Sequence, residues 1–174
     1  SMSPSPIIFA LANPVPEISY QRAKSLRPDA IVATGRSDNP NQINNVLAFP
    51  YLFRGALDTL STTINETMKI AAAKSIASIA QRAVSKEIVE QYGRTFTFGH
   101  EYILPKPGDK RLLTDVSVAV AQAAMTSGVA RRRIASLSEY NQTLLNRVDS
   151  ENFFAREYIR HKTGKQRVES KNII

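Results

Sequence analysis

The feature of this sequence that most constrains its fold is a pair of short apolar runs, residues 7–12 and 30–34. The first run is bounded by Pro6 and Asn13, and the second ends at Gly35, which is typical of buried parallel strands. The segment between them, Ser19 to Leu26, fits one short helix that ends before Pro28, because the residue that precedes a proline disfavours the helical region. Strand, helix and strand in this order predict a βαβ unit of an α/β fold with two parallel strands.

Both predicted strands are followed by loops rich in Asn, Asp, Ser and Pro, residues 13–17 and 35–45. Ligands of open α/β sheets bind beyond the carboxyl ends of the strands, so these loops are where we expect a binding site. An asparagine amide offers a hydrogen-bond donor and an acceptor without adding charge, which suits a carboxylate or carboxamide ligand beside a hydride-transfer centre. The alternative is that these asparagines only satisfy the local backbone at strand ends and turns.

The chain beyond Asn45 is predicted to be largely helical. Amphipathic spacing and capping residues mark the expected helices. They are residues 49–59, a long helix that opens with the Thr63–Glu66 capping box, residues 109–127 with Gly128 as their stop, and shorter helices that begin at Ser136 and near Ser150.

The 174 residues carry 23 Lys and Arg against 15 Asp and Glu, a net charge of +8. Most of the excess lies in residues 131–174, which hold ten basic and five acidic residues. No aromatic–basic interleaving accompanies this charge, so we expect a solvated surface or an intersubunit contact and no nucleic-acid partner. No apolar window reaches the roughly 18 residues of a membrane span, and no secretory signal is visible. The cytoplasm is therefore the expected compartment.

The glycine-rich turn GxGxxG, which opens most dinucleotide-binding domains, does not occur in this sequence. Two strands are also too few for a stable open sheet. We therefore interpret the chain as part of something larger.

Five segments, in one order along the chain, resemble malic enzymes of the short bacterial type. They are residues 7–18 (IIFALANPVPEI), 33–50 (ATGRSDNPNQINNVLAFP), 53–58 (FRGALD), 64–72 (INETMKIAA) and 102–107 (YILPKP). The sequence departs from the family pattern at Asn39, where an aromatic residue is usual, and at residues 108–110, which replace a Phe-Asp-Pro-like stretch. The resemblance covers about residues 1–130.

The resemblance implies that residues 1–130 are the C-terminal part of a Rossmann-like NAD(P)-binding domain, and that residues 131–174 are a basic helical extension. It implies oxidative decarboxylation of malate to pyruvate and CO2 with NAD or NADP and a divalent metal, Mg or Mn. Asn13 would contact the nicotinamide and the substrate, and Asn44 and Asn45 would contact the malate carboxylate. The family also suggests a homo-oligomer, a dimer or larger.

In the family, the acid–base Tyr and Lys, the carboxylate metal ligands and the glycine-rich turn lie upstream of the first strand seen here. The resemblance therefore implies no catalytic residue and no metal ligand in this chain, which is expected to be inactive alone. Asp38, Asp58 and Lys69 are interpreted as structural, since one carboxylate on a loop and one on a helix do not form a ligand set. His100 and His161 have no spaced partner. The alternative function is a non-catalytic binding or assembly module that retains the scaffold.

Overall fold

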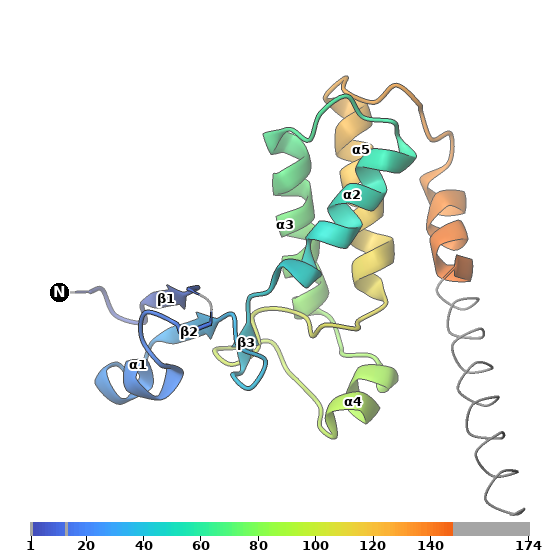
Figure 1. Ribbon diagram of the computed structural model, residues 1–174. Coiled ribbons are helices and arrows are strands. Elements are labelled where there is room, and N and C mark those ends of the chain that lie inside the picture. Colours follow the sequence, from blue (N-terminus) through green and yellow to red (C-terminus); the bar gives the residue numbers. More distant parts are fainter. Residues whose placement is uncertain (1, 13, 148–174) are drawn as a thin grey trace, which may run out of the picture. The chain divides into compact units, whose positions relative to one another are not determined.

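The structure is a computed structural model that describes residues 2–12 and 14–147. The chain forms two compact units, Ser1–Ala135 and Ser136–Ile174, and each is described by itself. The first unit holds a small parallel sheet with one short helix beside it, followed along the chain by a group of helices (Figure 1). The α/β fold expected from the sequence is confirmed.

The sheet has three strands in the order β1-β2-β3, all parallel. Their bounds are Ile7–Ala10 for β1, Ile31–Thr34 for β2 and Asn41–Gln42 for β3. The first two are the strands predicted from the apolar runs. The third was not predicted, because it consists of two polar residues and no apolar run marks it. It pairs with the end of β2, where Ala33 lies opposite Asn41.

One face of β1 is exposed, which makes the prediction of a fully buried first strand wrong. Ile7 is 61% exposed and Phe9 is 51% exposed, whereas Ala10 is buried and Ile8 packs on a small core shared with β2. Successive side chains of a strand point to opposite faces, and the described residues cover only the face that holds Ile8. An apolar run marks a strand, but it does not say which of its two faces is covered within the same chain.

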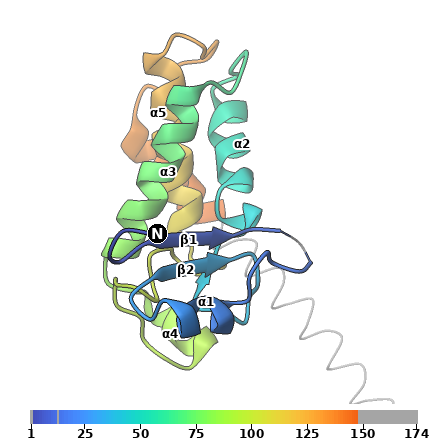
Figure 2. The ribbon, with the colours of Figure 1, turned by 90° about the vertical axis from the view of Figure 1, so that its left-hand side faces the viewer.

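Helix α1, Tyr20–Leu26, joins β1 to β2 and packs against β2 (Figure 2). Ser19 caps it, because its Oγ accepts a hydrogen bond from the Arg22 amide at 3.2 Å. Ala23 is fully buried against Ala30 and Val32. The predicted helix over residues 19–26 is confirmed to within one residue.

The remaining helices of the first unit follow β3 along the chain, and all of them except α4 contribute to a second, larger core. They are the 3-10 turn Asn45–Leu47, α2 at Phe49–Asp58, α3 at Glu66–Gln81, α4 at Lys86–Tyr92, the π-helical turn Leu112–Val116 and α5 at Ser117–Thr126. Helices α2, α3 and α5 lie side by side in both views (Figures 1 and 2). The core that they share with the π-helical turn contains Leu52, Met68, Ile76, Ile79, Leu112, Val116 and Val120.

Two details of these helices differ from the sequence predictions. The capping box at Thr63 was expected to open α3, but the cap is Asn65, whose Oδ1 accepts a hydrogen bond from the Met68 amide at 3.1 Å. The long helix also ends at Gln81, and a separate helix, α4, begins after Ser85, whose Oγ caps it. The end of α5 is as predicted, because Gly128 adopts a left-handed φ of 75° just beyond it.

In the second unit, residues 137–147 are helical, and the Oγ of Ser136 accepts a hydrogen bond from the Glu139 amide at 3.2 Å. This confirms the predicted start of that helix. The helix expected from about Ser150 lies outside the described residues. No helix within residues 2–12 and 14–147 is long and apolar enough to cross a membrane.

Candidate functional site

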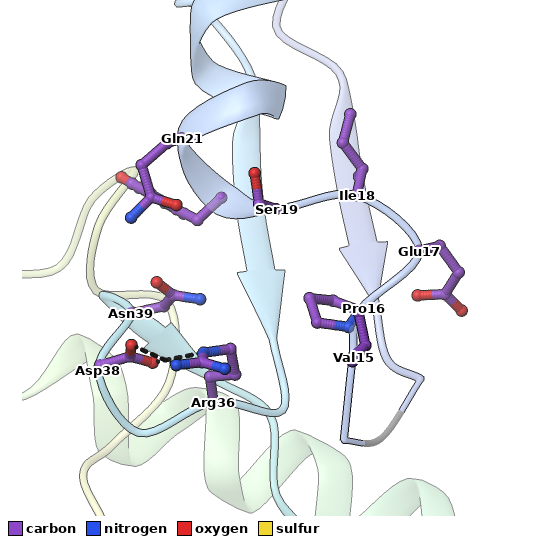
Figure 3. A pocket seen from close by; sticks show the side chains of 10 residues that line it. Val15, Pro16, Glu17, Ile18, Ser19, Gln21, Arg36, Asp38 and Asn39 are labelled. Carbon is purple, nitrogen blue, oxygen red and sulfur yellow. Dashed lines mark hydrogen bonds and ion pairs between the residues drawn. The ribbon is translucent and has the colours of Figure 1, made fainter.

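The loops that follow β1 and β2 form a pocket at the carboxyl ends of these strands, where ligands of open α/β sheets bind. The pocket has a volume of about 380 Å³. Figure 3 shows that Val15 and Pro16 come from the first loop, and that Arg36, Asp38 and Asn39 come from the second. The start of α1 completes the wall with Ser19, Tyr20 and Gln21. The two loops predicted to hold a site therefore do meet.

Both carboxylates in this pocket are bound within the protein. Glu17 Oε2 accepts a hydrogen bond from the Ala12 amide at 3.1 Å, and bonds from its own amide and from that of Ala12 lower the pKa of Glu17. Asp38 pairs with Arg36 at 2.8 Å, and the hydrogen bond from the guanidinium lowers the pKa of Asp38 (Figure 3). Both groups are ionised at neutral pH, and their bonds to Ala12 and Arg36 are local to the two loops.

Asn39, the residue that departs from the family pattern, stabilises the second loop by a buried hydrogen bond. It is 7% exposed, and its Nδ2 donates a hydrogen bond to Thr34 Oγ1 at 2.7 Å. Because Thr34 is the last residue of β2, this bond ties the loop back to the strand that it leaves. An amide here therefore has a structural partner, which an aromatic side chain would not have.

Asn44 and Asn45 stand just beyond β3 with exposed side chains. Asn44 caps the 3-10 turn, because its Oδ1 accepts a hydrogen bond from the Val46 amide at 3.0 Å. Asn45 is the first residue of that turn, and its side chain makes no hydrogen bond within the described residues. The two adjacent asparagines therefore differ. The side chain of Asn44 binds the backbone of the turn, whereas the exposed amide of Asn45 is available to a ligand. Asn13, the third predicted site residue, lies outside the described residues.

The residues that sequence analysis set aside as structural have local partners. Asp58 forms a bidentate pair with Arg54 on α2, and Lys69 pairs with Glu66 at 2.7 Å on α3. His100 contributes its backbone carbonyl to a hydrogen bond from Asn41. His161 lies outside the described residues. Within residues 2–12 and 14–147, no three His, Asp or Glu side chains gather in a way that could hold a metal ion.

Two buried polar residues near the second loop were not singled out as individual residues by the sequence analysis. Asn41 is 1% exposed and Lys106 is 6% exposed, and both bridge the loop to residues 100–106. The signal that could have found Lys106 is its place between two prolines in an otherwise apolar segment, Tyr102 to Pro107, where a solvated lysine is not expected.

A parallel α/β unit with a pocket at the carboxyl ends of its strands is typical of the open α/β proteins, which bind nucleotides and other ligands there. Within that class, this chain belongs to the malic enzyme family. Residues 1–92 match the family described as malic enzyme, NAD binding domain.

Individual relatives agree with this family. The chain is 55% identical over 149 residues to the probable NADP-dependent malic enzyme of Rickettsia prowazekii, a match that covers 85% of this chain and 19% of that protein. It is 51% identical over 140 residues to the NAD-dependent malic enzyme of Rhizobium meliloti, covering 80% of this chain and 18% of that protein. The crystal structure of malic enzyme from Pyrococcus horikoshii superimposes with a TM-score of 0.68 at 42% identity, over 90% of this chain and 34% of that one. The chain thus spans about one fifth of the length of these curated relatives.

Proposed function

We propose that this chain is part of a larger cytoplasmic malic enzyme, in which it helps to bind malate and a nicotinamide cofactor, NAD or NADP, for oxidative decarboxylation to pyruvate and CO2. The observation that carries the proposal is the exposed asparagine pair, Asn44 and Asn45, at the end of the parallel sheet of a malic enzyme NAD-binding domain. An uncharged amide there can donate a hydrogen bond to a substrate carboxylate without shifting the pKa values of the groups that transfer protons.

We assign different roles to the two asparagines, because their side chains differ in hydrogen bonding. The Oδ1 of Asn44 accepts the hydrogen bond that caps the 3-10 turn, and this bond fixes the local backbone. Asn45 keeps both ends of its amide available, so we assign the contact with the malate carboxylate to its Nδ2. Asn13 follows the neighbouring strand and is proposed to lie against the nicotinamide, where an amide can orient the ring for hydride transfer.

The proton transfers and the metal belong, in this proposal, to the remainder of the enzyme. A divalent cation prefers several carboxylate or carbonyl oxygens. The carboxylates at Asp38 and Asp58 are each engaged by an arginine, and the described residues offer no grouped ligand set. The residues that the structure describes therefore do not fit the Mg or Mn of the reaction, and we propose that they bind and orient the organic ligands.

The test is an activity assay on the complete enzyme and on residues 1–174 expressed alone. With malate, NAD or NADP and Mn or Mg, the complete enzyme should form pyruvate and reduced cofactor, and the isolated chain should form neither. Pyruvate formation by the isolated chain would contradict the proposal that the proton transfers and the metal belong to the remainder of the enzyme. A complete protein that binds malate but never oxidises it would support the second candidate, a non-catalytic binding or assembly module.

A further inference from the structure

Lys106 is a buried lysine whose ammonium group donates a hydrogen bond to a backbone carbonyl. It is 6% exposed, and its Nζ donates to the Pro40 carbonyl oxygen at 2.6 Å, across 66 residues of sequence. Burial of an ammonium group is costly unless the group is hydrogen-bonded. No ion pair joins Lys106 to a carboxylate within the part of the chain that the structure describes. An apolar residue would fill this position without the free-energy cost of burying an ammonium group, so a lysine here indicates a role beyond packing.

Two aromatic rings lie close to the ammonium group of Lys106. The Nζ lies 5.0 Å from the centroid of Phe96 and 5.9 Å from that of Tyr92, both within the range of a cation–π contact. Phe96 also stacks on Tyr102 at 5.1 Å between centroids. Burial lowers the pKa of Lys106, and the nearby positive charge of Arg94 lowers it further. The aromatic rings contact the ammonium group but supply no negative charge to neutralise it.

Asn41 makes a second connection between the same two segments. It is 1% exposed, its Nδ2 donates to the His100 carbonyl at 2.8 Å and to the Val32 carbonyl at 3.0 Å, and its Oδ1 accepts from the Ile103 amide at 3.0 Å. The three hydrogen bonds of this amide all go to backbone atoms. Residues 100–106 thus hold the second loop at two successive residues, Pro40 and Asn41.

These two connections lie just before the asparagine pair. On one side, β3 is held by β2, since the Ile43 amide donates to the Thr34 carbonyl at 2.8 Å. On the other side, residues 100–106 hold Pro40 and Asn41. Asn44 and Asn45 follow Ile43, so the backbone that leads to them is held from both sides.

We propose that Lys106 is a positioning residue for malate binding: it anchors the Pro40 carbonyl and thereby sets the place of Asn44 and Asn45. The inference rests on the proposed function of the asparagine pair. It assigns to the segment Tyr102–Pro107 a role that the asparagine loops alone do not supply. Lys106 itself touches neither substrate nor cofactor in this account.

The experiment compares three lysine variants of the complete enzyme with Asn45→Ala. Lys106→Met keeps the length of the side chain and removes the donor, and Lys106→Arg keeps a cationic donor. Lys24→Met is the matched control, because Lys24 Nζ also donates to a proline carbonyl, that of Pro28 at 2.8 Å, at the opposite end of β2. Each variant is measured for amide hydrogen exchange over residues 35–48, for the KM of malate and for kcat, alongside a melting curve.

We expect Lys106→Met to raise the exchange rate of residues 35–48 and the malate KM, the latter roughly tenfold, with a smaller change in kcat, because misplaced binding groups lose affinity steeply. Lys106→Arg should recover part of the KM, and Lys24→Met should leave both readouts unchanged. If Lys106→Met melts earlier but keeps the malate KM while Asn45→Ala raises it, the positioning role is wrong and the proposed function stands. If Lys106→Met loosens the loop and neither variant changes the KM, the proposed role of the asparagines is what fails.

Discussion

Gly55 on α2 lies so close to the Ser117 carbonyl on α5 that a Cβ atom added to it would stand 2.6 Å from that oxygen. The same Cβ would stand 2.8 Å from the Cβ of Val120. Both distances are below any ordinary contact, and the first is to backbone, which cannot rotate away. The absence of a side chain at residue 55 is what lets α2 and α5 approach within the helical core.

Gly55→Ala should therefore destabilise the protein, although alanine is the better helix former. Overpacking a core costs about 1–3 kcal/mol of stability. We expect a loss near the upper end of this range, because the Cβ would meet a backbone oxygen that cannot move aside. The free energy of unfolding in urea measures the loss. Gly99→Ala is the control, because the nearest atom to its added Cβ is the Thr97 carbonyl at 3.9 Å. Equal stability of Gly55→Ala and the unsubstituted protein would show that the helices can separate at no cost.

Local patterns predicted much of this fold. Apolar runs located β1 and β2, and Ser19 and Gly128 fixed the ends of α1 and α5, because each of these signals acts within one turn of the chain. The strand β3 and the exposed face of β1 were missed. A two-residue polar strand is defined by its partner, Ala33 opposite Asn41, and exposure depends on what else packs nearby.

The same distinction holds for the candidate site. The sequence located the two loops and the asparagine pair, since motif and strand end coincide there. It did not reveal that Lys106 and Asn41 hold the second loop, because both contacts join residues about 60 positions apart. It also left Asn44 and Asn45 equivalent, and only the hydrogen bond to the Val46 amide separates them.

The start of the sheet should be sensitive to acid through Asp29. Its carboxylate accepts hydrogen bonds from Arg27 and from the Ser5 amide at 2.8 Å, and these bonds, led by that of Arg27, hold the pKa of Asp29 well below its ordinary value. A carboxyl group with a lowered folded-state pKa stabilises the fold above its unfolded-state pKa, and this stability is lost as the pH falls toward the folded-state pKa.

Asp29→Asn should accordingly be less stable than the unsubstituted protein at pH 7, and the difference should shrink as the pH falls below about 4. Urea unfolding at pH 7 and at pH 3 measures both quantities. Glu90→Gln, an exposed substitution on α4, serves as the control for a general loss of negative charge. A difference between Asp29→Asn and the unsubstituted protein that stays constant with pH would contradict this account.

The isolated chain should self-associate through the exposed side of α2. Phe49, Phe53 and Leu57 are spaced four residues apart on this helix and are 47%, 49% and 62% exposed, and the two phenylalanine rings stack at 5.9 Å. Contiguous apolar surface of this kind is rarely left open in a monomer. Sedimentation of residues 1–174 should show oligomers that Phe53→Glu reduces. Leu26→Glu, at an equally exposed residue on α1, should reduce them less. A monomer at all concentrations would refute the prediction.

Asn44 and Asn45 should respond differently to substitution in the complete enzyme. Asn45→Ala removes the amide proposed to bind the malate carboxylate, a hydrogen bond to a charged group worth about 1.5–3 kcal/mol. The malate KM should rise roughly ten- to hundredfold at 1.4 kcal/mol per decade, with little change in melting temperature because the side chain is exposed. Asn13→Ala should instead lower kcat, since a misplaced nicotinamide matters only at the hydride-transfer step.

Two substitutions at Asn44 separate its capping role from a contact with the substrate. Asn44→Ala removes the cap on the 3-10 turn and should lower the stability by about 1 kcal/mol. Asn44→Ser removes the amide but keeps a hydroxyl oxygen that can accept from the Val46 amide, so it should restore the stability. If the malate KM of Asn44→Ser equals that of the unsubstituted enzyme while Asn45→Ala raises it, Asn45 carries the contact. A raised KM in Asn44→Ser with normal stability would transfer the substrate contact to Asn44. If Asn13→Ala, Asn44→Ala and Asn45→Ala keep normal kinetics and merely melt earlier, these asparagines serve only as turn formers.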